Sequence, residues 1–148
     1  MLGDHHKMVP MCVYRILLSA VSSLDNWKTI LASRTTSEGL VGGKSTGNKA
    51  ALLILNCETE PVAKTSEFNQ LLDSLLDILL QQPAGNYQNE RFVEIEGVKD
   101  ELAAAIGLIR ENITVKKGMV IEGENIGIYV RSTNKDYPAH GSYGSLIK

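Results

Sequence analysis

The apolar run from Ala50 to Leu55 is the feature that most constrains how this chain folds. The run ends at Asn56, and a short polar loop containing Pro61 leads into periodic apolar residues that begin near Ser66. A short apolar run between turn-forming residues is typical of a buried strand. Because loops held by rigid elements often carry binding groups, we expect the loop after this strand to be the binding element.

The composition narrows the possible functions. With 148 residues, the chain is long enough for one domain with one hydrophobic core. Its formal net charge of -2 and aromatic share of 5% provide neither a basic field nor stacking platforms, so we expect no direct nucleic acid partner. Its apolar runs are shorter than the roughly 18 residues of a membrane span, so we expect no membrane partner. Cys12 and Cys57 are unpatterned, which indicates free thiols in a reducing compartment.

Two segments have the apolar periodicity of amphipathic helices. We expect one helix over Ser66 to Leu80, with Ser66 as its N-cap. Its apolar residues recur at intervals of three or four: Phe68, Leu71, Leu72, Leu75, Leu76 and Leu79. Pro83 and Gly85 prevent this helix from continuing. The same spacing predicts a second helix from Val98 to about Arg110.

Alternating apolar residues predict strands before and after these helices. Leu40-Val41 and the run from Ala50 to Leu55 form a first expected hairpin, with residues 45–48 as its turn. Residues 113–121 and 126–130 form a second expected hairpin, and residues 92–95 a short strand. Hairpins with helices grouped between them are typical of an α+β fold. We therefore expect an antiparallel sheet of about three to four strands, covered on one face by two helices, plus an N-terminal helix.

The N-terminal segment leaves two interpretations open. Residues 13–27 carry apolar side chains at helical spacing, which predicts an amphipathic helix packed on the domain. The same segment contains serines, and Asp4 is the only acid before Asp25, as in mitochondrial transit peptides. Both interpretations fit the residues equally well.

Motifs for nucleotide or metal binding do not fit their required patterns. Residues 39–45 resemble a phosphate-binding loop, but Glu38 stands where the first glycine belongs, so a hairpin turn is the better interpretation. The histidines lack spaced partner ligands, so we expect no metal site and no cofactor. His140 is expected to be a solvated loop residue, although a surface contact is an alternative.

The loop that contains Pro61 carries the only residues that suggest acid–base chemistry. Glu58 and Glu60 would share one face of an extended segment, and such a pair could serve a small enzyme. An acid–base pair also needs a concave apolar site, which the sequence does not indicate. We therefore interpret Glu58 to Lys64 as a protein-contact loop and expect no enzyme.

Several motifs, in order, resemble one protein family. Arg34 to Gly42 followed by Leu55 to Ala63 resembles translation elongation factor Ts, which has S-x-G-L-V/I-G and then N-C-E-T-D-F-V-A. Glu111 to Lys117 resembles the family's G-E-N-I/M-x-x-R-R strand entry, and Ile126 to Tyr129 its G-x-Y hairpin. The resemblance covers about residues 27–131. The sequence of residues 27–42 is most similar to the mitochondrial branch of the family.

The resemblance implies a guanine nucleotide exchange factor for elongation factor Tu. In the family, this part of the core contacts the GTP-binding domain of elongation factor Tu, and its loop reaches the magnesium and phosphate site so that GDP leaves. The mitochondrial likeness implies a location in the mitochondrial matrix. The resemblance also implies, by position, which residues bind the partner. The loop contributes Thr59, Glu60, Pro61 and Val62. The pair before Glu111 contributes Ile109 and Arg110, and the G-x-Y hairpin is followed by Arg131.

Four of these residues depart from the family pattern. Glu60 replaces aspartate, Pro61 replaces the phenylalanine that acts as an apolar wedge, Arg110 replaces glycine and Arg131 replaces histidine. Burying an aromatic side chain is worth roughly 1.5–3 kcal/mol, so losing the wedge would weaken the complex about 10- to 100-fold. The resemblance therefore also allows a truncated chain that binds elongation factor Tu without promoting exchange.

The resemblance also implies a division of the chain into three parts. Residues 1–26 are the N-terminal helix or transit-like segment. Residues 27–131 are the N-terminal half of the family's core. Residues 132–148 are the start of a truncated second core subdomain.

Overall fold

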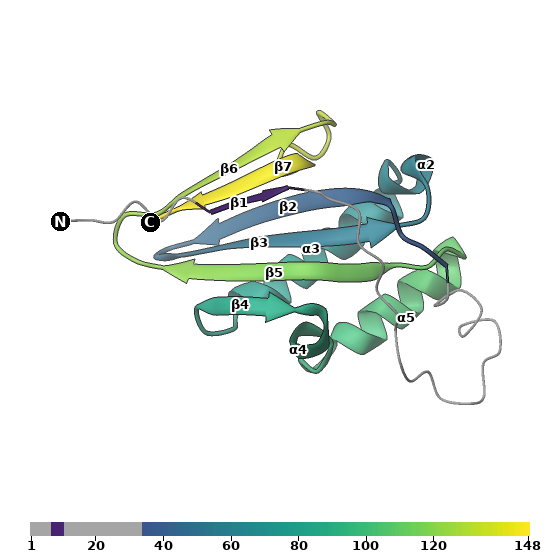
Figure 1. Cartoon of the computed structure of the whole chain (residues 1–148), viewed down its shortest axis with the longest axis horizontal. Coiled ribbons are helices and arrows are strands. Elements are labelled where there is room, and N and C mark those ends of the chain that lie inside the picture. The colour runs from purple at the N-terminus through teal and green to yellow at the C-terminus, as the bar shows by residue number, and fades with distance from the viewer. Residues whose placement is uncertain (1–6, 11–33) are drawn as a thin grey trace.

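The computed structural model of the protein describes residues 7–10 and 34–148 (Figure 1). Within these residues, seven strands form one antiparallel sheet: β1 (Lys7–Pro10), β2 (Glu38–Thr46), β3 (Lys49–Cys57), β4 (Gly85–Gln88), β5 (Thr114–Glu122), β6 (Gly127–Ser132) and β7 (His140–Ile147). The order across the sheet is β1-β7-β2-β3-β5-β4, and β6 also pairs with β7. The α+β class and the antiparallel sheet are confirmed, whereas the predicted strand count of about three to four is too low.

The described part of the chain also contains four helices: α2 (Glu60–Ala63), α3 (Ser66–Leu80), α4 (Asn89–Val93) and α5 (Val98–Ile109). Both predicted long helices, α3 and α5, are confirmed, but the N-cap of α3 is Thr65, whose side chain accepts a bond from the Phe68 N–H. The predicted strand over residues 92–95 is wrong. Residues 89–93 form α4 instead, and this turn of helix buries Phe92 completely.

β3 is the central strand of the sheet. It pairs with β2 from Glu38↔Cys57 to Thr46↔Lys49, which confirms the first predicted hairpin. It also pairs with β5 along most of its length, and every residue of β3 except Lys49 is buried. A strand buried on both faces explains why its sequence is a continuous apolar run rather than an alternating one.

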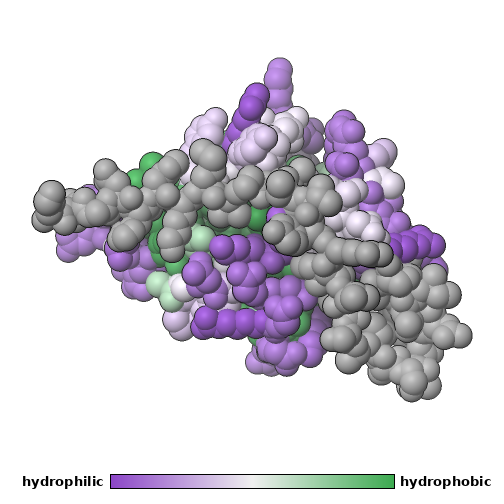
Figure 2. All heavy atoms as spheres, viewed as in Figure 1, coloured by the Kyte–Doolittle hydropathy of each residue, from purple (hydrophilic) through white to green (hydrophobic). Residues whose placement is uncertain are grey.

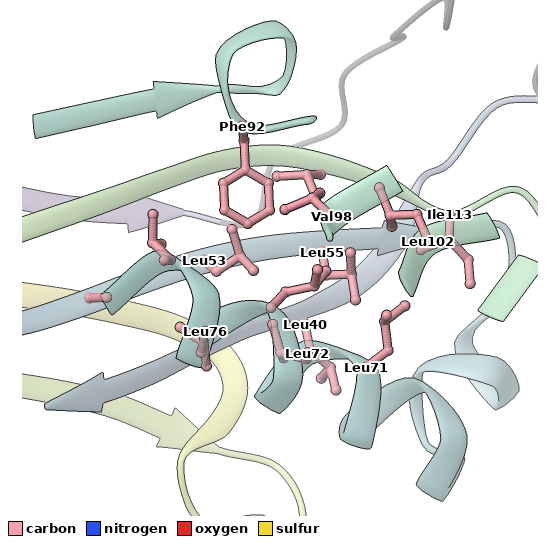
Figure 3. Close-up of a cluster of buried hydrophobic side chains, with 14 of the residues drawn as sticks. Leu40, Leu53, Leu55, Leu71, Leu72, Leu76, Phe92, Val98, Leu102 and Ile113 are labelled. Carbon is pink, nitrogen blue, oxygen red and sulfur yellow. The ribbon is translucent and has the colours of Figure 1, made fainter. Parts of the chain in front are cut away.

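The helices cover one face of the sheet and form the helix-side core. Leu53 and Leu55 of β3 belong to the same buried cluster as Leu72 and Leu76 of α3 (Figure 3). α5 adds Val98 and Leu102 to this cluster, and α4 adds Phe92. Each side chain is at most 8% exposed, so this cluster is the main apolar core of the described residues.

The opposite face of β3 packs against the β6–β7 hairpin and forms the hairpin-side core. Leu52 and Ile54 cluster there with Leu146 of β7, and Ile128 and Val130 of β6 pack against them. The predicted hairpin between residues 113–121 and 126–130 is therefore wrong, because β6 pairs with β7 instead. Through its pairing with β7, β6 places its apolar side chains over the face of the sheet opposite to the helices.

The structure does not test the predicted N-terminal helix or the predicted boundary at residue 131. The amphipathic helix expected over residues 13–27 lies outside the described residues. β7 lies in residues 132–148 and pairs with β2 at Val41↔Gly141 and Gly42↔His140, so it shares the sheet with the preceding part. The proposed boundary at residue 131 stays a prediction.

The visible surface of the described residues is largely polar. In Figure 2 hydrophilic residues dominate wherever the surface is coloured, and smaller hydrophobic patches lie between them. None of the helices in the described ranges is long and apolar enough to cross a membrane.

Candidate partner-binding loop

The loop after β3 forms the short helix α2 at one end of the sheet (Figure 1). Glu60 and Pro61, which we call the tip, are exposed in its first turn. Val62 packs against the helix-side core and Ala63 is buried within it. A proline fits here because N–H groups in the first turn of a helix have no intrahelical partner. The fold therefore turns the tip towards solvent and the rest of α2 towards the core.

The C-terminal end of α2 is held by the first turn of α3. The hydroxyl of Thr65 donates to the Val62 carbonyl at 2.7 Å and accepts from the Phe68 N–H at 3.3 Å. The buried amide of Asn69 donates to the carbonyls of Ala63 at 3.1 Å and Thr65 at 2.7 Å. α2 is thus fixed to a helix whose apolar face is fully packed.

The N-terminal end of α2 is joined to the segment after α5 by two carboxylates. Glu111 accepts from the Thr59 N–H at 3.1 Å and from the Thr59 hydroxyl at 2.7 Å. In the reverse direction, Glu58 accepts from the Asn112 N–H at 2.7 Å, and Arg34 lies 3.6 Å from its other oxygen. Hydrogen bonds to ionised acceptors are among the stronger ones in proteins, so these bonds form a firm connection.

The turn between α5 and Glu111 depends on Arg110. Arg110 has a left-handed backbone with φ of 64°, and its N–H donates to the Ile106 carbonyl at 2.9 Å. This left-handed conformation ends α5 and favours glycine. The family that the sequence resembles has glycine at this position. Ile109 packs against the helix-side core. The structure thus brings the predicted residues Ile109 and Arg110 to the same end of the sheet as Thr59.

The loop does not form an acid–base site. The Glu58 carboxylate is occupied by the Asn112 N–H and by Arg34, while Glu60 is exposed on the tip. A hydrogen bond with Lys64, at 2.7 Å, lowers the pKa of Glu60 and keeps its carboxylate charged. Among the residues that the structure describes, no group of three His, Cys, Asp or Glu side chains could hold a metal ion.

Cys57 is buried at the base of the loop and is not a reactive nucleophile. Its thiol donates to the Thr59 carbonyl at 3.2 Å. Burial, together with the nearby charge of Glu111, raises the pKa of Cys57 to about 12. Because the thiolate is the reactive form, Cys57 stabilises the loop rather than attacking a substrate.

The remaining predicted residue, Arg131, lies on a different element. It is exposed on β6 and pairs with Tyr143 of β7. Shortly after it, Thr133 and Asn134 line a cavity of about 220 Å³ together with Ala63 and Lys64 from the α2 region. The segment after β6 therefore lies near the C-terminal end of α2.

Two interactions that support the loop were missed from the sequence. His140 is only 3% exposed, not solvated as expected, and its Nδ1 lies 2.8 Å from Oδ1 of Asn69. No sequence pattern connects these two residues, which are 71 positions apart. Glu111, in contrast, belongs to a motif that carried the family resemblance, so its position could have been identified as structurally important.

The fold and the loop define an α+β unit with helices on one face of a curled antiparallel sheet and a short acidic tip at one end. The sequence model of the family described as Elongation factor TS matches residues 58–147. This match covers more than half of the chain, and the chain belongs to the elongation factor Ts family. The family links it to translation, that is, to protein biosynthesis.

Curated relatives agree with this assignment. Elongation factor Ts of Leifsonia xyli subsp. xyli is 37% identical over 112 residues, which are 72% of this chain and 40% of that protein. Elongation factor Ts of Paenarthrobacter aurescens is 31% identical over 108 residues, 72% of this chain and 39% of the relative. The protein of the same name from Deinococcus deserti is 34% identical over 135 residues, 90% of this chain and 48% of the relative. The chain thus spans less than half the length of each of these relatives.

Proposed function

We propose that this chain binds elongation factor Tu and promotes the release of GDP during protein synthesis. The observation that carries the proposal is the exposed tip, Glu60 and Pro61, on a helix anchored at both ends. An anchored tip loses little conformational entropy when it enters a partner, so more of its contact energy remains for binding. The contact residues are the seven predicted ones: Thr59, Glu60, Pro61, Val62, Ile109, Arg110 and Arg131.

The physical basis of exchange is linkage between two ligands of one partner. A factor that binds nucleotide-free elongation factor Tu more tightly than the GDP-bound form weakens GDP binding by the same ratio. The chain makes or breaks no bond, so its described residues need no nucleophile or metal. We expect the tip to enter the magnesium and phosphate region of the partner, where a charged Glu60 disturbs metal binding.

The second candidate is a chain that binds elongation factor Tu without accelerating exchange. Pro61 in the first turn of α2 favours it, because proline cannot supply the aromatic contact of the phenylalanine found in the family. Both candidates place the chain in contact with the same partner, and they differ only in the rate of GDP release. The mitochondrial matrix stays a predicted location, and the bacterial relatives do not support it.

Stopped-flow release of a fluorescent GDP analogue from elongation factor Tu tests both candidates. We expect the chain to accelerate release, and Pro61→Phe to lower the concentration needed for half-maximal acceleration about 10- to 100-fold. Pro83→Phe, at an exposed proline beyond α3, is the matched control and should change nothing. Co-purification without acceleration would select the second candidate, and absence of binding by both the chain and Pro61→Phe would refute both.

A further inference from the structure

Thr59 occupies the N-cap position of α2 but does not cap it. A threonine there normally accepts a bond from an N–H of its own helix, which stabilises the helix. The side chain of Thr59 makes no such bond. Its hydroxyl donates instead to Oε2 of Glu111 at 2.7 Å, across 52 positions of sequence. The orientation of this turn is therefore determined by a residue outside the loop.

Glu111 holds both polar groups of Thr59 at once. Its Oε1 accepts the Thr59 N–H at 3.1 Å while its Oε2 accepts the hydroxyl. A carboxylate that binds one residue through both oxygens fixes the direction of that residue as well as its position. Thr59 directly precedes the tip, so its direction decides where Glu60 and Pro61 point.

Glu111 is itself set in place by its neighbours on both sides. Arg110 turns the chain with its left-handed backbone immediately before it. Asn112, immediately after it, donates its N–H to Glu58 at 2.7 Å and its side-chain amide to the Arg34 carbonyl at 2.8 Å. Asn112 is only 1% exposed, so the segment that carries Glu111 is firmly packed.

We infer that Glu111 is a positioning residue for nucleotide release: it aims the tip through Thr59 and does not contact elongation factor Tu itself. This inference rests on the proposed function. Since hydrogen bonds to a charged acceptor hold the tip in position, loss of Glu111 should reduce the maximal rate of GDP release about 10-fold or more. A residue that only contributed contact area would instead change the concentration needed for half-maximal release.

A double-mutant cycle separates positioning from contact. We would measure GDP release as a function of chain concentration for Glu111→Ala, Thr59→Val and the double variant. If Glu111 acts through Thr59, the maximal rate of GDP release should be no lower for the double variant than for Glu111→Ala alone, whereas a direct contact of Thr59 would change the concentration needed for half-maximal release. Glu111→Gln keeps one acceptor oxygen and should retain an intermediate maximal rate. Glu124→Ala removes the same charge from an exposed turn and is the control, with no expected change.

A second readout on the free chain does not depend on exchange activity. Glu111→Ala should speed hydrogen exchange at the Thr59 amide about 10-fold or more while the melting temperature changes little, because the two bonds to Thr59 are lost only locally. Effects of Glu111→Ala and Thr59→Val that multiply in the maximal rate of GDP release would overturn the inference and leave the proposed function standing. A wild-type chain that fails to promote GDP release would refute the proposed function alone. Hydrogen exchange at the Thr59 amide would then decide whether Glu111 holds the tip. An unchanged rate of hydrogen exchange at this amide in Glu111→Ala would overturn the inference.

Discussion

Arg110 is the residue at which local backbone preference and sequence disagree most clearly. It is the only non-glycine residue of the described chain with a positive φ, 64°. The left-handed conformation costs a residue with a Cβ about 1–2 kcal/mol, a cost that glycine does not have. The departure from the family's glycine is therefore a local loss of stability at the turn that leads to Glu111.

Arg110→Gly should stabilise the chain. We expect the free energy of unfolding to rise by about 0.5–1 kcal/mol, because relief of the left-handed strain exceeds the entropy that glycine adds to the unfolded state. Urea denaturation followed by circular dichroism measures this change. Ala104→Gly, at an exposed right-handed position inside α5, is the matched control and should lower the free energy of unfolding by about 1 kcal/mol. Destabilisation by Arg110→Gly would mean that contacts of the arginine side chain outweigh the strain.

Among the elements, β2 depends on glycine for its close packing with α3. A Cβ placed on Gly42 would lie 2.8 Å from both Leu72 Cγ and Leu76 Cδ1. Both leucines are completely buried and have no space into which to move. On its other face, a Cβ on Gly43 would lie 2.6 Å from Ile128 Cδ1 of β6. The two glycines thus let one strand contact a helix on one face and a hairpin on the other.

Gly42→Ala should lower the free energy of unfolding by about 1–3 kcal/mol, as overpacking of a core usually does. Gly127→Ala is the control, because its nearest neighbour, Ile147 Cβ, is 3.9 Å away and β6 is exposed there. We expect it to change the free energy of unfolding by less than about 0.5 kcal/mol. Equal urea midpoints for the two variants would contradict close packing at Gly42.

The contact between His140, the first residue of β7, and α3 makes stability depend on pH. Burial lowers the pKa of His140, and this effect exceeds the opposing influence of Asp73. As pH falls through 6.5, the usual histidine value, the unfolded chain takes up a proton that the folded chain does not. The contribution of His140 is therefore present above this pH and is lost below it.

We expect the urea midpoint to decrease between pH 7.5 and pH 5.5. In His140→Gln the midpoint should be lower at pH 7.5, because the bond to Asn69 is altered, but it should fall less steeply towards pH 5.5. Parallel pH profiles for the wild-type chain and His140→Gln would show that His140 does not cause the dependence.

The elements that the sequence predicted well are those with local causes. α3 and α5 follow from apolar spacing, and the β2–β3 hairpin follows from two strands joined by a two-residue turn with Gly47 at φ of 54°. The pairing of β6 with β7 was missed because alternation shows which face of a strand is apolar but not which strand it joins. The loop itself was predicted, but its anchors at Glu111 and Asn69 depend on contacts across the fold that no local pattern encodes.

At the scale of the whole molecule, stability should be highest at β3 and lowest at β6. β3 is hydrogen-bonded on both sides and buried on both faces, whereas β6 pairs only with β7 in the described sheet and none of its residues is fully buried. Amides in a central, buried strand such as β3 exchange only when the whole domain unfolds.

Native-state hydrogen exchange measured by NMR should therefore show the slowest amides at Leu53, Ile54 and Leu55. Amides of β6, such as those of Tyr129 and Arg131, should exchange at least about 100-fold faster, through local opening. Uniform rates across both strands would mean that the sheet opens only as one unit.

Because α2 is held by hydrogen bonds at both ends, the tip can be substituted without disturbing the fold around it. Thr59 is fixed by Glu111, and Thr65 is fixed by its own bonds to Val62 and Phe68. Of the residues between Thr59 and Thr65, only Val62 and Ala63 are required for the surrounding packing. Natural variation or engineering can rewrite Glu60 and Pro61 with little effect on folding. Substitutions at the tip thus change the exposed surface at this end of the sheet and leave the scaffold unchanged.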